Sequence, residues 1–184
     1  MRNENLKMLI VTALFAAIIG IMAQLTIPLP LVPITGQTLA IGLAATILGK
    51  RYGTLSVLVY IMLGIAGLPV FSAMTSGLGI VFGPTGGYII GFIPAAFIIG
   101  WYLERFGFTV THAIIANIMG TVVTLTFGAV WLKFIAELSW TAVLAGGVTP
   151  FIIVGIIKAV IAATVGIIVR KRLTSAKLLP VVIA

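Results

Sequence analysis

The sequence predicts an all-α membrane protein with six transmembrane helices, built as a single integral-membrane domain over residues 1–184. Hydrophobic residues make up 61% of the chain and charged residues only 8%, whereas soluble proteins carry about 25% charged residues. The apolar runs are long and lack the two-residue alternation of a membrane β-barrel. Most basic residues fall between these runs, as they do in helical membrane proteins.

The first helix is expected over residues 6–24. A basic start followed by an apolar run also suits a signal peptide, but residues 24–33 offer no convincing small-residue cleavage site, so a retained helix is preferred. Ala13, Ala17 and Gly20 share one face of this helix, with Ala16 beside them. Small residues at this spacing let another helix approach closely. That helix belongs either to a partner or to this same protein.

A charge-free segment rich in proline follows, over residues 26–37. Pro28, Pro30 and Pro33 exclude a regular helix and favour extended chain. The second helix is then expected over residues 38–49, which at the usual rise span roughly 18 Å, short of the ~30 Å hydrocarbon core. The proline segment must therefore complete the crossing or dip into the membrane. A tight turn at Lys50 and Arg51 is expected to lead into a third helix over residues 54–68.

Residues 64–91 hold eight of the 21 glycines and two prolines, and they carry no charge. This stretch is apolar enough to enter a bilayer but too irregular to be helical throughout. An unpaired backbone amide in hydrocarbon costs several kcal/mol, so irregular backbone survives there only where protein buries it or water reaches it. We therefore expect a loop that folds back over a cavity and forms part of a binding site. An ordinary external loop is the alternative.

Three more helices are expected, over residues 87–103, 110–134 and 151–169. The fifth is the longest and carries Asn117, Thr121 and Thr124 on one face. A link containing Trp140 joins the fifth helix to the sixth.

The basic residues separate between the two ends of these helices. Six crossings put nine of them on one side and Lys133 alone on the other, with Lys158 inside the sixth helix. By the positive-inside rule both termini are cytoplasmic, and the two irregular glycine- and proline-rich loops are external. The net charge of +8 therefore reflects membrane orientation and not nucleic-acid binding. The nine are Arg2, Lys7, Lys50, Arg51, Arg105, Arg170, Lys171, Arg172 and Lys177.

Lys158 is the one cation deep within a predicted span. A lysine at mid-helix costs about 2.5–3.5 kcal/mol on insertion scales, and Glu4, Glu104 and Glu137 all lie near predicted interfaces. An anionic ligand is the simplest partner for it. Snorkelling towards the helix end, about two turns away, is the alternative.

The candidate substrate-binding residues are of two kinds. Some lie in or beside the irregular loops, and the others lie inside a predicted span. Asn117 is a polar group within a span, and a hydrogen bond between helices is its alternative role. Gln37 and Tyr88 begin helices directly after the irregular segments, while Tyr88 or Trp140 could equally be an interface aromatic. The full set is Gln37, Gly86, Tyr88, Asn117, Trp140 and Lys158.

Enzymatic and metal-binding motifs are missing from the sequence. There is no phosphate-binding G-x-x-x-x-G-K-[ST] loop, no cysteine, and no pair of carboxylates suited to Mg²⁺. His112, the only histidine, indicates a structural or interfacial residue. We therefore expect no enzyme, no metal site and no cofactor.

Four segments resemble the BioY family, the biotin-specific S components of energy-coupling factor (ECF) transporters. They are residues 33–53, 67–71, 82–92 and 150–160, with the PITGQT and FGPTGGY blocks the most specific. The resemblance implies a six-helix protein of the bacterial cell membrane that binds biotin from outside. It also implies a transmembrane coupling subunit and two cytoplasmic ATPases as partners, with Ala13 and Ala17 on the docking surface.

One residue departs from the family pattern. The family often has an acidic residue three positions before the lysine of the sixth helix, where this chain has Gly155. Biotin combines an apolar ring and chain with a ureido group and a carboxylate, which suits a cavity with one lysine and one asparagine. The alternatives are a solitary transporter or channel for a small anionic vitamin, and a membrane scaffold. A scaffold leaves Lys158 and the glycine-rich loop without a purpose.

Overall fold

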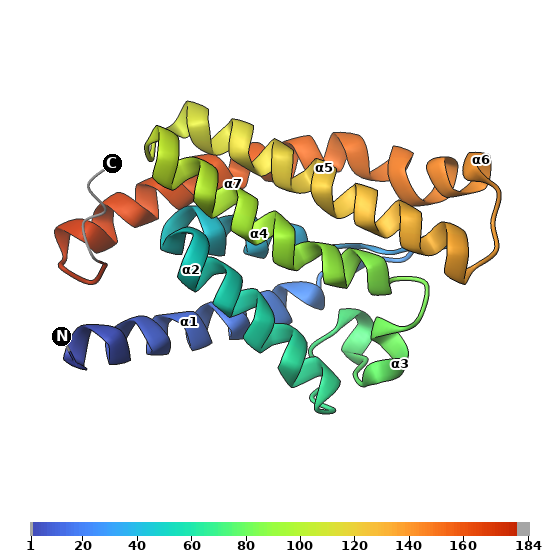
Figure 1. Ribbon diagram of the computed structural model, residues 1–184, viewed down its shortest axis with the longest axis horizontal. Helices are drawn as coiled ribbons and strands as arrows, with labels where there is room; N and C mark the ends of the chain where they lie inside the picture. Colours follow the sequence, from blue (N-terminus) through green and yellow to red (C-terminus); the bar gives the residue numbers. More distant parts are fainter. Residues whose placement is uncertain (1, 180–184) are drawn as a thin grey trace.

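The computed structural model describes residues 2–179, with side chains described from residue 5 onward. Five long helices pack side by side along the length of the molecule (Figure 1). α4 lies between α2 and α5, and α7 contacts both α2 and α5, so these four helices form a closed ring with α1 packed outside it on α2. The five are α1 (Arg2–Ala23), α2 (Gln37–Ile65), α4 (Gly86–Phe106), α5 (Val110–Ile135) and α7 (Thr149–Ser175).

Within the described residues, four helical stretches are long and apolar enough to cross a membrane: Asn5–Ala23, Gly86–Phe106, Val110–Ile135 and Trp140–Ser175. The prediction of a helical membrane protein is confirmed at this coarse level. The link expected before the sixth helix is itself helical. It consists of α6 (Trp140–Val143) and the π-turn η2 (Leu144–Val148), which continue into α7.

The second and third predicted helices are the two limbs of one bent element, α2. The expected turn lies one residue earlier than predicted, because Lys50 and Arg51 are both helical. Only Gly49 leaves the helix, at φ 78°, a left-handed conformation that glycine adopts without a steric penalty. One residue therefore reverses the chain, and the two limbs diverge from this bend (Figure 1).

Side chains of neighbouring helices satisfy the backbone groups at the bend. The amide of Lys50 donates to Glu104 Oε1 at 2.8 Å, and Lys50 Nζ lies 3.2 Å from Glu104 Oε2. The guanidinium of Arg170 donates to the carbonyl oxygen of Ile47. A helix bend leaves such backbone groups without hydrogen-bond partners in their own helix. Side chains of α4 and α7 therefore supply the hydrogen bonds that the bend at Gly49 removes.

The two irregular segments form short ordered elements. The proline-rich segment is an antiparallel hairpin of β1 (Thr26–Ile27) and β2 (Ile34–Thr35), and the glycine-rich segment contains η1 (Ser72–Met74) and α3 (Leu78–Val81). The hairpin tip and α3 both point away from the end of the molecule where the two termini lie (Figure 1).

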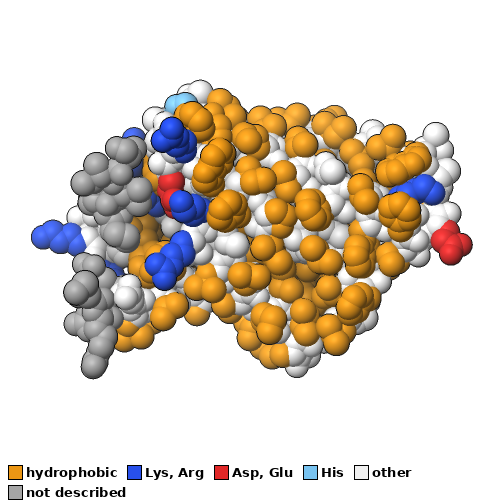
Figure 2. Space-filling model, viewed as in Figure 1, with side chains coloured by type: hydrophobic (Ala, Val, Ile, Leu, Met, Phe, Trp, Pro, Cys, Tyr) orange, Lys and Arg blue, Asp and Glu red, His pale blue; other side chains and the backbone are white. Residues whose placement is uncertain are grey.

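Apolar side chains cover most of the visible surface of the long helices, and basic side chains gather at the end that holds the termini (Figure 2). Lys133 lies instead in the last turn of α5, at the opposite end (Figure 1). The side chains of Arg2 and Glu4 lie outside the described residues.

Candidate functional site

A cavity of about 270 Å³ lies inside the helix ring, beneath the hairpin and the η1 segment. Lining residues recur every three or four positions on each helix, so α4, α5 and α7 each turn one face inward. Most of the lining is apolar. The contributors from the long helices are Gln37 and Thr38 from α2, Tyr88, Ile89 and Phe92 from α4, Thr121, Thr124 and Leu125 from α5, and Phe151, Val154, Gly155 and Lys158 from α7.

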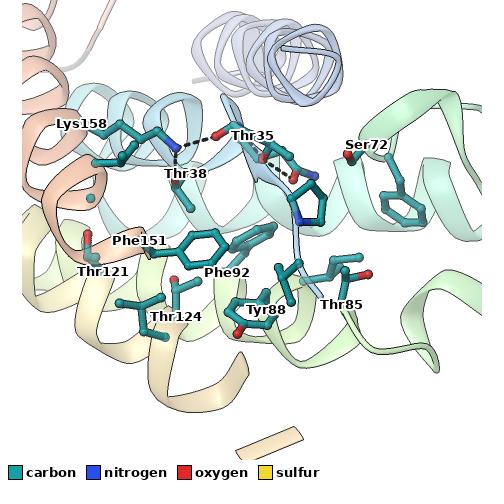
Figure 3. A pocket seen from close by; sticks show the side chains of 18 of the residues that line it. Thr35, Thr38, Ser72, Thr85, Tyr88, Phe92, Thr121, Thr124, Phe151 and Lys158 are labelled. Carbon is teal, nitrogen blue, oxygen red and sulfur yellow. Dashed lines mark hydrogen bonds between the residues drawn. The ribbon is translucent and has the colours of Figure 1, made fainter. Parts of the chain in front are cut away.

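Lys158 is fixed against the hairpin. Its Nζ donates to the carbonyl oxygen of Thr35 at 2.6 Å and to Thr38 Oγ1 at 3.2 Å (Figure 3). Among the described side chains no carboxylate forms a salt bridge with it. An ammonium group has three N–H donors, so the two bonds leave one donor for a ligand in the cavity. The hairpin thus offsets part of the cost of placing this cation within the span.

A network of hydrogen bonds between buried side chains lies next to Lys158. Thr35 Oγ1 donates to Gln37 Oε1 at 2.7 Å, and Gln37 Nε2 donates to the hydroxyl of Tyr60, which is fully buried. The Gln37 side chain therefore makes most of its hydrogen bonds within the protein, although it also lines the cavity. The network holds the end of the hairpin in position beside Lys158.

Aromatic rings form the opposite wall. The Tyr88 and Phe151 rings stack at 6.1 Å between centroids, with an interplanar angle of 30°, and Phe92 lies beside them (Figure 3). The Tyr88 hydroxyl donates to the carbonyl oxygen of Gly147 at 2.8 Å. This bond uses the polar end of Tyr88 within the protein, so its ring offers an apolar face to a ligand.

Three candidate residues lie outside the cavity wall. Asn117 is 3% exposed, and its Nδ2 donates to Thr46 Oγ1 at 3.0 Å and to the Ala113 carbonyl oxygen at 2.8 Å. The first of these bonds is the interhelical contact left open as its alternative role. Gly86 packs against the end of α3, where a Cβ would collide with the Val81 carbonyl. Trp140 is half-exposed and borders a separate groove between α5 and α7.

The structure therefore brings together Gln37, Tyr88 and Lys158, and it adds residues that the sequence did not single out. These include hydroxyl groups of the hairpin, of α2 and of residues 71–75, and rings of α4, of α7 and of residues 71–75. A phenylalanine or threonine in an apolar span is ordinary, so only the packing of the helices identifies these. They are Thr35, Thr38, Ser72, Phe71, Phe92 and Phe151.

Comparison with known proteins identifies the family. The family model described as the BioY family matches residues 1–175. This chain belongs to the BioY family. The biotin transporter BioY2 of Lactococcus lactis subsp. cremoris (strain MG1363) is 41% identical over 174 residues, covering 95% of this chain and 96% of that protein. The biotin transporter BioY of Thermotoga maritima is 37% identical over 166 residues, covering 90% of this chain and 97% of that protein.

A solved structure agrees with the BioY assignment. The crystal structure of the S-component for biotin from an ECF-type ABC transporter matches with a TM-score of 0.84 and 30% identity, covering 93% of this chain and 94% of that chain. These relatives are transporters or a transporter component and not enzymes. With its four membrane-length apolar helices, this BioY chain is an integral membrane protein.

Gly155, where the resemblance led us to expect an acidic residue, lies in the cavity wall. A Cβ at Gly155 would lie 2.8 Å from Thr121 Cγ2, tighter than an ordinary carbon–carbon contact. Thr121 in turn donates its hydroxyl to the Asn117 carbonyl oxygen at 3.0 Å. α5 thus occupies the space in which a larger side chain at position 155 would begin.

Proposed function

We propose that this chain is the high-affinity biotin-binding subunit of an ECF-type vitamin transporter in the bacterial cytoplasmic membrane. The observation that carries the proposal is Lys158, a cation with one unused donor at one side of a cavity lined by Tyr88, Phe92 and Phe151. A carboxylate suits that donor, and an apolar bicyclic ring suits the aromatic wall. The biotin transporters among its relatives support the choice of biotin over other anionic vitamins.

We also propose six membrane crossings with both termini in the cytoplasm, formed by one binding unit over residues 1–184. The two limbs of α2 are the second and third crossings, each completed by the irregular segment that flanks it. The gathering of basic side chains at the end that holds the termini supports this orientation (Figure 2). The hairpin and the η1 segment, which cover the cavity, then face outward, so biotin enters from outside.

Transport requires partners in this proposal. The sequence has no nucleotide-binding loop, so two cytoplasmic ATPases and a transmembrane coupling subunit supply the energy. We propose α1 as the docking helix for the coupling subunit. Ala13 and Ala17 support this choice because both are exposed, whereas Gly20 is buried with Val70 packed against it. Small exposed residues allow the close approach that helix association in lipid needs.

Calorimetric titration of the detergent-purified protein tests the proposal. Biotin should bind at one site per chain, and pantothenate and nicotinate should produce no binding heat, because their carboxylates lack the bicyclic ring that fills the aromatic wall. Absence of biotin binding would overturn the proposed function. Equal affinity for pantothenate would leave an anion site but remove the assignment to biotin.

A further inference from the structure

One side chain, Gln24, fastens the cavity roof to the end of α1. Its Nε2 donates to the carbonyl oxygen of Phe71 at 3.0 Å and to that of Gly20 at 3.0 Å. Its Oε1 accepts from the amide of Met74 at 2.9 Å. A single amide group therefore bonds its own helix and both ends of a segment about fifty residues away.

The segment that Gln24 holds is conformationally strained. Ala73 and Met74 have φ angles of 54° and 57°, in the left-handed region that costs a residue with a Cβ of order 1–2 kcal/mol. Phe71 and Thr75 close the segment with one backbone bond of 3.0 Å. Such strain persists only where the surroundings enforce it, and Gln24 bonds the two backbone groups that bracket Ala73.

The same segment forms the roof of the cavity. Phe71, Ser72, Ala73 and Thr75 all line it. The buried Phe71 ring packs edge-on against Tyr60 at 5.7 Å, with an interplanar angle of 84°. The Ser72 hydroxyl adds a link of 3.1 Å to Thr26 in the hairpin. In the proposed orientation this segment lies between a ligand in the cavity and the outside, so lifting it opens an exit.

We infer that Gln24 is a positioning residue that holds the roof segment, residues 71–75, closed over the ligand and so sets the rate of ligand release. The identity of the ligand as biotin rests on the proposed function. Lifting the roof breaks the bonds from Gln24 to Phe71 and Met74, and both exist only in the closed state. Their loss therefore accelerates dissociation, whereas association changes less, because it starts from the fraction of free protein whose roof is already open.

Two substitutions at this position test the inference. Gln24→Leu removes both roof bonds, and a neutral hydrogen bond contributes enough for roughly a threefold to tenfold change in rate, so we expect dissociation to accelerate by an order of magnitude. Gln24→Glu keeps the acceptor for the Met74 amide but sets a carboxylate oxygen against the Phe71 and Gly20 carbonyl oxygens, so its dissociation should also be faster than that of the wild type. Thr126→Val is the matched control, because its hydroxyl bonds only its own helix, at the Val122 carbonyl.

The measurement is release of radiolabelled biotin from the purified full-length protein into excess unlabelled biotin, with association measured separately. An unchanged dissociation rate in Gln24→Leu overturns the inference. An equal change in both rates also overturns it, because a merely structural role predicts that result. If Gln24→Leu does not fold, Gln24→Glu alone decides, and a wild-type dissociation rate overturns the inference.

Separate experiments can refute the proposed function and the inference about Gln24. If the wild-type protein does not bind biotin, the proposed function fails and the tether is tested without ligand. Exchange of the Met74 amide hydrogen should then be faster in Gln24→Leu than in wild type. Equal exchange would overturn the tether itself.

Discussion

Replacing Lys158 with methionine tests the chemistry of the cavity most directly. Methionine is similarly long and unbranched but carries no charge. The ammonium group of Lys158 already donates to Thr35 and Thr38 and has one donor left. A hydrogen bond to a charged group contributes about 1.5–3 kcal/mol, and 1.4 kcal/mol is a tenfold change in affinity. We therefore expect the Kd for biotin to rise ten- to hundredfold.

The substitution also removes the bond from Lys158 to Thr35 in the hairpin. A second ligand separates this effect from the loss of contact with the carboxylate. Biotinamide replaces the carboxylate of biotin with a neutral amide. If Lys158 meets the carboxylate, Lys158→Met weakens the binding of biotin much more than that of biotinamide. If the loss comes from the freed hairpin, both ligands weaken equally. Calorimetric titration of both proteins with both ligands completes the cycle and gives the coupling between lysine and carboxylate.

Lys133→Met is the matched control, because Lys133 lies in the last turn of α5 and does not line the cavity. It should bind both ligands as the wild type does. Unchanged biotin affinity in folded Lys158→Met would refute the role of this residue, and equal weakening of biotin and biotinamide would refute direct contact with the carboxylate.

Three more predictions concern the roof, the docking helix and the bend. Hydrogen exchange across residues 69–88 should slow when biotin binds, because closure orders a glycine-rich loop; equal protection in both states argues against closure. Tryptophan at both Ala13 and Ala17 should leave biotin binding intact and abolish co-purification with the coupling subunit, since bulky rings prevent close helix approach. Normal assembly would place the docking face elsewhere, and lost binding would mean that this face packs internally. Glu104→Leu should lower the free energy of unfolding by about 1–3 kcal/mol, because the Lys50 amide loses its acceptor; an unchanged thermal midpoint would contradict this.

The helices were predictable because hydrocarbon requires long apolar runs with internal hydrogen bonding. The bend in α2 was predicted in position but not in form. The sequence predicted a tight turn at Lys50 and Arg51, whereas Gly49 alone makes the turn and both basic residues are helical. The reason lies far away in the sequence, in Glu104 and Arg170, which bond the backbone groups of the bend. No local pattern around Gly49 shows such partners.

The candidate site was predictable where a residue type was costly in its place. Lys158 stood out because a charge within a span needs a partner, and it lies in the cavity wall. Asn117 stood out for the same reason, but its amide donors go to Thr46 and Ala113. Polarity in a span thus indicates that a partner exists without indicating whether it is a ligand. The aromatic wall gave no signal, because Phe92 and Phe151 differ from lipid-facing phenylalanines only in the direction they face.

The bend in α2 has a consequence for how this protein is made. Its limbs, residues 37–48 and 50–65, are each shorter than the ~20 residues that an independent crossing needs. The side chains that complete the bend come from Glu104, 54 positions after Lys50, and from Arg170, 123 positions after Ile47. When the ribosome has synthesised α2, neither partner exists. The bonds that complete the bend can therefore form only after α4 and then α7 have been synthesised. Synthesis of α2 therefore precedes the completion of its bend.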